Sequence, residues 1–189
     1  NTQDKMTDQL SEESKSRLLR VARESLEIFL TSGQRTVFTS EIPELLKKRA
    51  VFVTLRKKVS GNLRGCVGQI EARYRLIEAV AKTAIFSAVD DSRFPPLEPD
   101  ELPNLLIEIN VLTPSAPIKP EAVEIGKHGL QLSKGTSGGL FLPEVALSNG
   151  WDRLTFLDEL CRKADLPKGS WQETDAELRS FETESWEEN

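Results

Sequence analysis

The stretch Leu63-Arg64-Gly65-Cys66-Val67-Gly68 decides how the first half of the chain is expected to fold. It follows the turn pair Gly61-Asn62 and an apolar segment, which predicts the return strand of a β-hairpin. Side chains alternate between the two faces of a strand, so Arg64 and Cys66 should share one face and Val67 should lie on the other. Two glycines within four residues indicate a place where the backbone bends or is closely approached.

The elements before this hairpin are predicted from caps and apolar spacing. Residues 1–10 are polar and are expected to be loose. Ser11, followed by two glutamates, is typical of a helix N-cap, and apolar residues then recur at helical spacing until Gly33. A short helical stretch is expected over 43–48. The next segment, 51–55, is apolar on both faces and therefore predicts an internal strand.

The segment after the hairpin predicts a second helix and another strand. Apolar residues give a wide helical stripe over 76–88, and Pro95-Pro96 prevents any continuation of that helix. Over 105–112, apolar residues alternate with Glu108 and Asn110, which predicts a strand with one partly polar face.

The C-terminal part predicts a second hairpin and a third helix. Residues 130–132 and 140–142 should pair across a glycine-rich turn at 135–139, and Pro143-Glu144-Val145 should close the hairpin. Asp152 is a candidate N-cap for the third helix. The remainder is expected to be a loop, one last strand and an acidic end. This irregular mixture favours an α+β fold, with a mixed or antiparallel sheet and flanking helices.

The composition limits the class of protein. A chain of 189 residues with 38% hydrophobic content supports one domain, expected over 11–189 and divided into two lobes. The net charge of −5 argues against a general nucleic-acid binder, so RNA is not expected as a partner. No stretch approaches the roughly 18 apolar residues of a membrane span. We therefore expect a cytoplasmic protein without a membrane partner.

The cysteines and the histidine limit the chemistry. Cys66 and Cys161 lie far apart and form no paired motif, so reduced thiols are expected. His128 is the one histidine of the chain and has no cysteine pair near it. A zinc site of cysteine and histidine is therefore not expected, and the sequence indicates neither a metal nor a cofactor.

Cys66 is the first candidate for a catalytic role. A guanidinium at Arg64 would stabilise its thiolate and make it a better nucleophile. His128 would act as the base if it folds back against the thiol, with Glu108 or Asn110 as the group that orients it. The alternative is that Cys66 is a small residue that packs between glycines.

Two further features suggest binding. Arg93 lies in a polar loop at the end of the second predicted helix, where its fork of donors suits a carboxylate or a phosphate. The run from Lys47 to Arg64 is basic throughout, with no acidic residue. It offers an alternative function, in which the basic hairpin surface binds a protein or RNA without catalysis.

Several motifs follow one another along the chain: Leu63–Gly68, Asp91–Pro96, Glu101-Leu102, Ile107–Thr113, Gly126–Leu130, Leu142–Ala146, Gly150–Asp152 and Phe156-Leu157. Taken together, these motifs resemble the AMMECR domain family over nearly the whole chain from about Ser11 onward. Val67 stands where isoleucine is usual in the signature of that family. The position of His128 is often acidic in prokaryotic members, which weakens His128 as an indispensable base.

The resemblance implies an α+β fold with a larger and a smaller lobe around a cleft, and with the signature hairpin near that cleft. It also implies a Memo-like protein and a radical S-adenosylmethionine enzyme as partners. It leaves the reaction open. We expect a small anionic or modified substrate, held by Arg64, Arg93 and Asn110 and attacked by Cys66.

Overall fold

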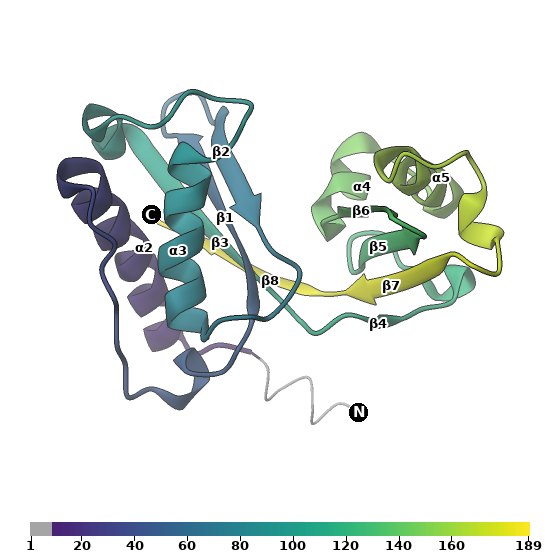
Figure 1. Cartoon of the computed structure of the whole chain (residues 1–189), viewed down its shortest axis with the longest axis horizontal. Helices are drawn as coiled ribbons and strands as arrows, with labels where there is room; N and C mark the ends of the chain where they lie inside the picture. Colours follow the sequence, from purple (N-terminus) through teal and green to yellow (C-terminus); the bar gives the residue numbers. More distant parts are fainter. Residues whose placement is uncertain (1–8) are drawn as a thin grey trace. The chain divides into compact units, whose positions relative to one another are not determined.

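Two antiparallel four-stranded sheets with flanking helices make up the computed structural model, which describes residues 9–189 (Figure 1). The chain divides into two units, one of residues 9–112 with 184–189 and one of residues 113–183. The predicted α+β class is thereby confirmed. A cleft between the two lobes stays a prediction.

The regular elements alternate irregularly along the chain. The helices are α2 (Glu12–Ser32), α3 (Leu76–Val89), α4 (Pro143–Asn149) and α5 (Arg153–Lys163), with 3-10 turns at Pro43–Leu45, Pro99–Asn104, Pro120–Ala122 and Ser170–Gln172. The strands are β1 (Ala50–Lys57), β2 (Leu63–Gly68), β3 (Leu105–Leu112), β4 (Ala116–Pro117), β5 (Gly129–Lys134), β6 (Ser137–Phe141), β7 (Glu177–Phe181) and β8 (Thr183–Glu187).

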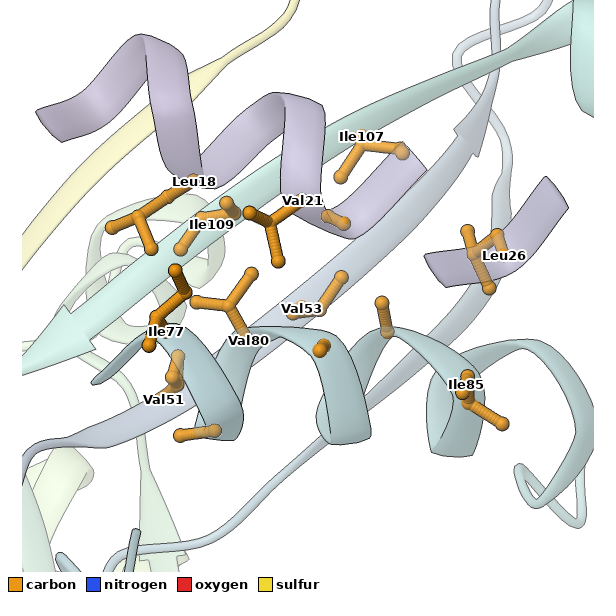
Figure 2. Close-up of a cluster of buried hydrophobic side chains, with 14 of the residues drawn as sticks. Leu18, Val21, Leu26, Val51, Val53, Ile77, Val80, Ile85, Ile107 and Ile109 are labelled. Carbon is orange, nitrogen blue, oxygen red and sulfur yellow. The ribbon is translucent and has the colours of Figure 1, made fainter. Parts of the chain in front are cut away.

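In the first unit, the strand order is β2-β1-β3-β8, and α2 and α3 cover one face of the sheet (Figure 1). β1 is central because it pairs with β2 on one side and with β3 on the other. Figure 2 shows the aliphatic core between the helices and this face. Its fully buried members include Leu18, Val21, Val53, Val80, Ile107 and Ile109.

The predicted caps of α2 are present. The Ser11 hydroxyl accepts a hydrogen bond from the Ser14 backbone N–H at 3.2 Å. Gly33 ends the helix at a φ of 74°, in the left-handed region that glycine adopts readily. The Glu44 carboxylate accepts hydrogen bonds from the hydroxyls of Ser11 and Ser14, which ties the following 3-10 turn to the start of α2.

Gly65 lies where α3 touches β2 backbone to backbone. A Cβ on this residue would lie 2.0 Å from the Ser87 carbonyl oxygen. The Ser87 hydroxyl accepts a hydrogen bond from the Val67 N–H at 3.0 Å and donates one to the Val53 carbonyl at 2.7 Å. One helical serine thereby links β1 to β2, and this requires the absence of a side chain at Gly65.

Gly68 serves the opposite face of the same strand. It pairs with Phe52 of β1, and a Cβ on Gly68 would lie 2.2 Å from the Phe52 ring. The phenyl ring therefore covers the glycine. Both glycines of the signature are explained by close packing, one against the helix and one against an aromatic ring.

The second unit has the strand order β4-β7-β5-β6, with α4 and α5 packed on it. Phe141, Trp151 and Phe156 lie near one another in its core, in edge-on and tilted arrangements with ring-centroid separations of 5.5 to 6.3 Å. Asp152 caps α5 as predicted, because its carboxylate accepts the Thr155 N–H at 2.8 Å.

Three predictions for this unit need correction. The tight turn covers only Gly135 and Thr136, while Gly138 and Gly139 belong to β6. Residues 143–149 form α4, because a proline suits the first turn of a helix and Gly150 ends it in the left-handed region. The single last strand is two strands, and β8 joins the sheet of the first unit beside β3.

We predict that Gly65→Ala destabilises the protein by about 2 kcal/mol or more, because the new methyl group must push the backbones of α3 and β2 apart. Urea unfolding followed by circular dichroism measures the change. Gly138→Ala is the matched control, since the nearest atom to its added Cβ would lie at 3.5 Å. Equal midpoints for the two variants would contradict this account of the signature.

Candidate functional site

A row of polar side chains crosses the sheet of the first unit on the face turned away from α2 and α3. Thr54 lies opposite Cys66 in the β1–β2 pairing and opposite Glu108 in the β1–β3 pairing. Ser185 of β8 extends the row by donating to Glu108 Oε1 at 2.9 Å. Asn110 lies two residues along β3 on the same face. We call the surface of Thr54, Cys66, Glu108, Asn110 and Ser185 the polar face.

These side chains contact one another directly. The Thr54 hydroxyl and the Cys66 sulfur are 3.3 Å apart, a hydrogen bond in which either atom can be the donor. Asn110 Nδ2 donates to Glu108 Oε1 at 3.3 Å, and Arg56 Nε lies 3.8 Å from Glu108 Oε2. Glu108 therefore gathers polar groups from β1, β3 and β8.

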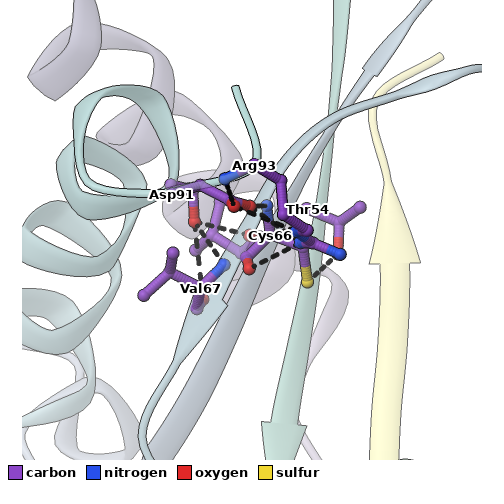
Figure 3. Close-up of polar contacts among 7 residues, drawn as sticks. Thr54, Cys66, Val67, Asp91 and Arg93 are labelled. Atoms are coloured by element: carbon purple, nitrogen blue, oxygen red, sulfur yellow. Dashed lines mark hydrogen bonds and ion pairs between the residues drawn. The ribbon is translucent and has the colours of Figure 1, made fainter. Parts of the chain in front are cut away.

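The loop after α3 holds the backbone of Cys66 at the free edge of the sheet (Figure 3). The Asp91 carboxylate accepts the Cys66 N–H at 2.9 Å, and Arg93 donates to the Cys66 carbonyl at 3.4 Å. Asp91 and Arg93 also pair through two hydrogen bonds, of 2.7 and 3.0 Å. The loop therefore takes the place of a further strand beside β2.

The thiol of Cys66 differs from the prediction. Burial raises its pKa above the ordinary value, and the carboxylates of Asp91 and Glu108 act in the same direction. The Thr54 hydrogen bond and the Arg93 charge lower the pKa but do not outweigh burial. The structure gives no support to the expected thiolate beside Arg64, because the pKa of the thiol is raised and the cation that acts on it is Arg93.

Arg64 contacts Glu101 and not the thiol of Cys66. Its guanidinium forms a two-pronged ion pair with Glu101, at 2.9 and 3.1 Å, and lies 5.9 Å from the centre of the Phe94 ring. Only 7% of its side chain is exposed. Hydrogen bonding from Arg64 also keeps the pKa of Glu101 below its usual value. This residue links β2 to the 3-10 turn at 99–104, and its Nη1 is a buried donor without a hydrogen-bond partner among residues 9–189.

Arg93 is likewise paired, with the buried carboxylate of Asp91. Both guanidiniums predicted to hold an anionic substrate are thus matched by a carboxylate of the same unit. This arrangement does not favour an anionic ligand.

His128 belongs to the second unit, whereas Cys66 belongs to the first. Its ring Nδ1 accepts a hydrogen bond from the Glu124 backbone N–H at 2.9 Å, across the turn that precedes β5. The contacts of Cys66 described above come from β1 and from the loop after α3. A role for His128 as the base stays a prediction.

The basic run divides between the two ends of β1. Lys47 and Lys48 precede the strand, Lys57 ends it and Lys58 follows it, so the pairs are separated by about 30 Å at the usual rise per residue. All four lysines are exposed. The predicted basic hairpin surface is therefore two separate clusters of positive charge.

Within residues 9–189, no group of three or more histidine, cysteine, aspartate or glutamate side chains is arranged to hold a metal ion. No helix in that range is long and apolar enough to cross a membrane.

Sequence reasoning missed three members of the site. Thr54 is the one polar residue of its predicted strand, and this interruption of an apolar run was the signal for it. Asp91 lies beside the predicted Arg93, but only the fold shows that its carboxylate reaches the backbone of Cys66. Ser185 gave no signal, since its partner Glu108 is 77 residues away.

We predict that Asp91→Asn lowers the free energy of unfolding by about 2 kcal/mol at pH 7, since the variant loses charge-assisted hydrogen bonds to Arg93 and Cys66. Those hydrogen bonds, that from Arg93 above all, hold the pKa of Asp91 well below its usual value. The contribution of the Asp91 carboxylate to the free energy of unfolding is therefore complete above the unfolded-state pKa of about 3.9. It is lost as the pH falls toward the pKa of the folded state.

Urea unfolding at pH 7, 5 and 3 measures this difference. The gap between wild type and variant should be constant from pH 7 to 5 and smaller at pH 3. Asp90→Asn, at the exposed neighbouring position, is the control and should have little effect. A gap that widens as the pH falls would show that the carboxylate is not the stabilising form.

Comparison with known proteins agrees with the fold. A family model described as AMMECR1 matches residues 19–186. Protein MK0488 of Methanopyrus kandleri is 38% identical over 97% of this chain and 92% of its own length. Protein PH0010 of Pyrococcus horikoshii is 41% identical over 90% of this chain and 88% of its own.

The crystal structure of uncharacterized protein PH0010 from Pyrococcus horikoshii superposes with a TM-score of 0.89. The aligned chains are 39% identical, and the match covers 95% of this chain and 94% of the other. The similarity therefore extends through both sheets and does not single out one unit.

Proposed function

The chain belongs to the AMMECR1 family, and we propose that its polar face binds a small molecule and engages it through the thiol of Cys66. The observation that carries this proposal is the contrast between the two faces of one sheet. The face toward α2 and α3 is aliphatic, with Val53, Ile107 and Ile109 fully buried. The other face aligns a thiol, a hydroxyl and a carboxylate in adjacent strands.

The hydrophobic core of this unit does not require these polar side chains, because it packs on the other face of the sheet. Two members of the polar face, Thr54 and Asn110, are buried, whereas Cys66 and Glu108 are partly accessible. Convergent polar groups at the edge of a core are typical of binding and catalytic sites. Cys66 remains partly accessible, whereas Cys161 is fully buried in the second unit. Among the two thiols, Cys66 is therefore the one that a ligand can reach.

The side chains of the polar face suit a thiol that reacts only with a bound ligand. Because its pKa is raised, Cys66 is protonated at rest and is protected from general oxidation. In reaction with a carbonyl carbon, a carbon–sulfur bond would form, the carbonyl π pair would move to oxygen, and the thiol proton would pass to Glu108. Thr54 lies between the sulfur and that carboxylate.

The other expected functions stay predictions. The division of the lysines between two ends of β1 gives no support to a single basic surface for RNA or protein. A Memo-like protein and a radical S-adenosylmethionine enzyme stay predicted partners. A cytoplasmic location likewise stays a prediction.

We predict that iodoacetamide alkylates Cys66 in the folded protein and leaves Cys161 unmodified. The rate should rise with pH around a midpoint above the ordinary thiol pKa of about 8.5, because burial raises the pKa of Cys66. Arg93→Gln should move the midpoint up, since it removes a positive charge, and Glu108→Gln should move it down. Mass spectrometry over a pH series measures all three rates.

Arg162→Gln is the control, because this exposed arginine lies in the second unit and pairs with Glu159. It should leave the midpoint unchanged. The proposal fails if Cys66 in the absence of urea is alkylated no faster than the protein unfolds globally. No ligand could then reach the thiol in the native state.

A further inference from the structure

Asn110 carries a buried hydrogen-bond acceptor that has no donor. The residue is 1% exposed, and within the described part of the chain its Oδ1 has no hydrogen-bond partner. The orientation of the amide follows from its other end, where Nδ2 donates to Glu108 Oε1 at 3.3 Å. Turning the amide over would place two oxygens together, so the unpaired group is the oxygen.

The surroundings of this oxygen are rich in acceptors. The neighbouring Glu108 carboxylate has two oxygens, which can accept about four hydrogen bonds in total. Its hydrogen-bond donors are Asn110 and Ser185, and Arg56 lies somewhat farther away. The acceptors on this part of the polar face can therefore accept further hydrogen bonds. A buried acceptor without a donor is energetically unfavourable.

Phe52 is the neighbour of Asn110 across the sheet, directly opposite it in the β1–β3 pairing. Its ring leans away from β3, over Gly68 of β2. A ligand that extends from Asn110 toward β2 would thus have a hydrogen-bond acceptor at one end and the Phe52 ring farther along the sheet. These groups suit a short carbon chain that ends in an N–H group.

We propose that the ligand of the polar face presents an N–H donor, as an amine or amide does, to Asn110 Oδ1 and Glu108 while its other end meets Cys66. This inference rests on the proposed function. It replaces an anionic ligand, because a negative group here would meet a carboxylate and an unpaired oxygen, while Arg64 and Arg93 are already paired with Glu101 and Asp91.

The distances on the sheet suit a small molecule. Cys66 and Glu108 are two strands apart, which is about 10 Å between their Cα atoms. Their side chains point to the same face and shorten this gap. A two-carbon arm attached to the sulfur can therefore bring a nitrogen to the carboxylate and its asparagine neighbour.

Disulfide capture tests this inference. The Cys66 thiolate attacks one sulfur of a symmetric disulfide, a new S–S bond forms, and the other half leaves as a thiolate that takes a proton from water. Three probes are compared: N,N′-diacetylcystamine, which carries an N–H group; dimethyl 3,3′-dithiodipropionate, which is neutral and has no donor; and 3,3′-dithiodipropionate, which is anionic. Intact-mass spectrometry gives each rate, divided by that of an unstructured cysteine peptide.

The amide probe should be captured about fivefold faster than the ester, as expected for one added hydrogen bond, and the anion should be slowest. Asn110→Leu should bring the ratio of amide to ester down to that of the peptide. Asn104→Leu, at an exposed position in the same unit, is the control and should leave the ratio unchanged.

Two other outcomes would contradict the proposals. Fastest capture of the anionic probe, or an equal ratio in wild type and Asn110→Leu, would overturn the N–H ligand and leave the thiol site intact. Capture of none of the probes by the folded protein would refute the proposed function itself.

Discussion

The contact between the backbones of α3 and β2 at Gly65 is the constraint on which the rest of the first unit depends. The Ser87 carbonyl occupies the space where any other residue would hold its Cβ, and the Ser87 hydroxyl joins β1 to β2. Because the helix lies so close, the aliphatic side chains of β1 and β3 are sealed against α2 and α3. The polar side chains of β1 and β3, Thr54, Glu108 and Asn110, then lie on the other face.

The six-residue signature thus combines two roles that the sequence alone does not separate. Its glycines and Arg64 hold the architecture together, through α3, the Phe52 ring and Glu101 respectively. Cys66 is the polar member without such a role, with its backbone fixed by Asp91 and its sulfur beside Thr54. A rigid backbone under a partly accessible thiol is the arrangement expected of a site that is organised before its ligand arrives.

The sequence predicted what local rules control. The caps at Ser11 and Gly33, the double proline after α3 and the alternation in β3 all placed their elements within a residue or two. It did not predict the partners of charged groups. Arg64 was expected to act on the adjacent thiol, but Glu101, 37 residues away, offers it a matched carboxylate. The return of β8 to the first sheet, and with it Ser185, depends on tertiary pairing that no local pattern encodes.

The central claim is that the polar face is kept for a ligand and not for the stability of the fold. The free energy of unfolding of Asn110→Leu in urea, without ligand, tests this most directly, because leucine is close to asparagine in size and removes the unpaired oxygen. We predict a variant as stable as wild type or more stable by about 1 kcal/mol. A loss of about 2 kcal/mol or more would show that Asn110 supports the fold, and would contradict the account.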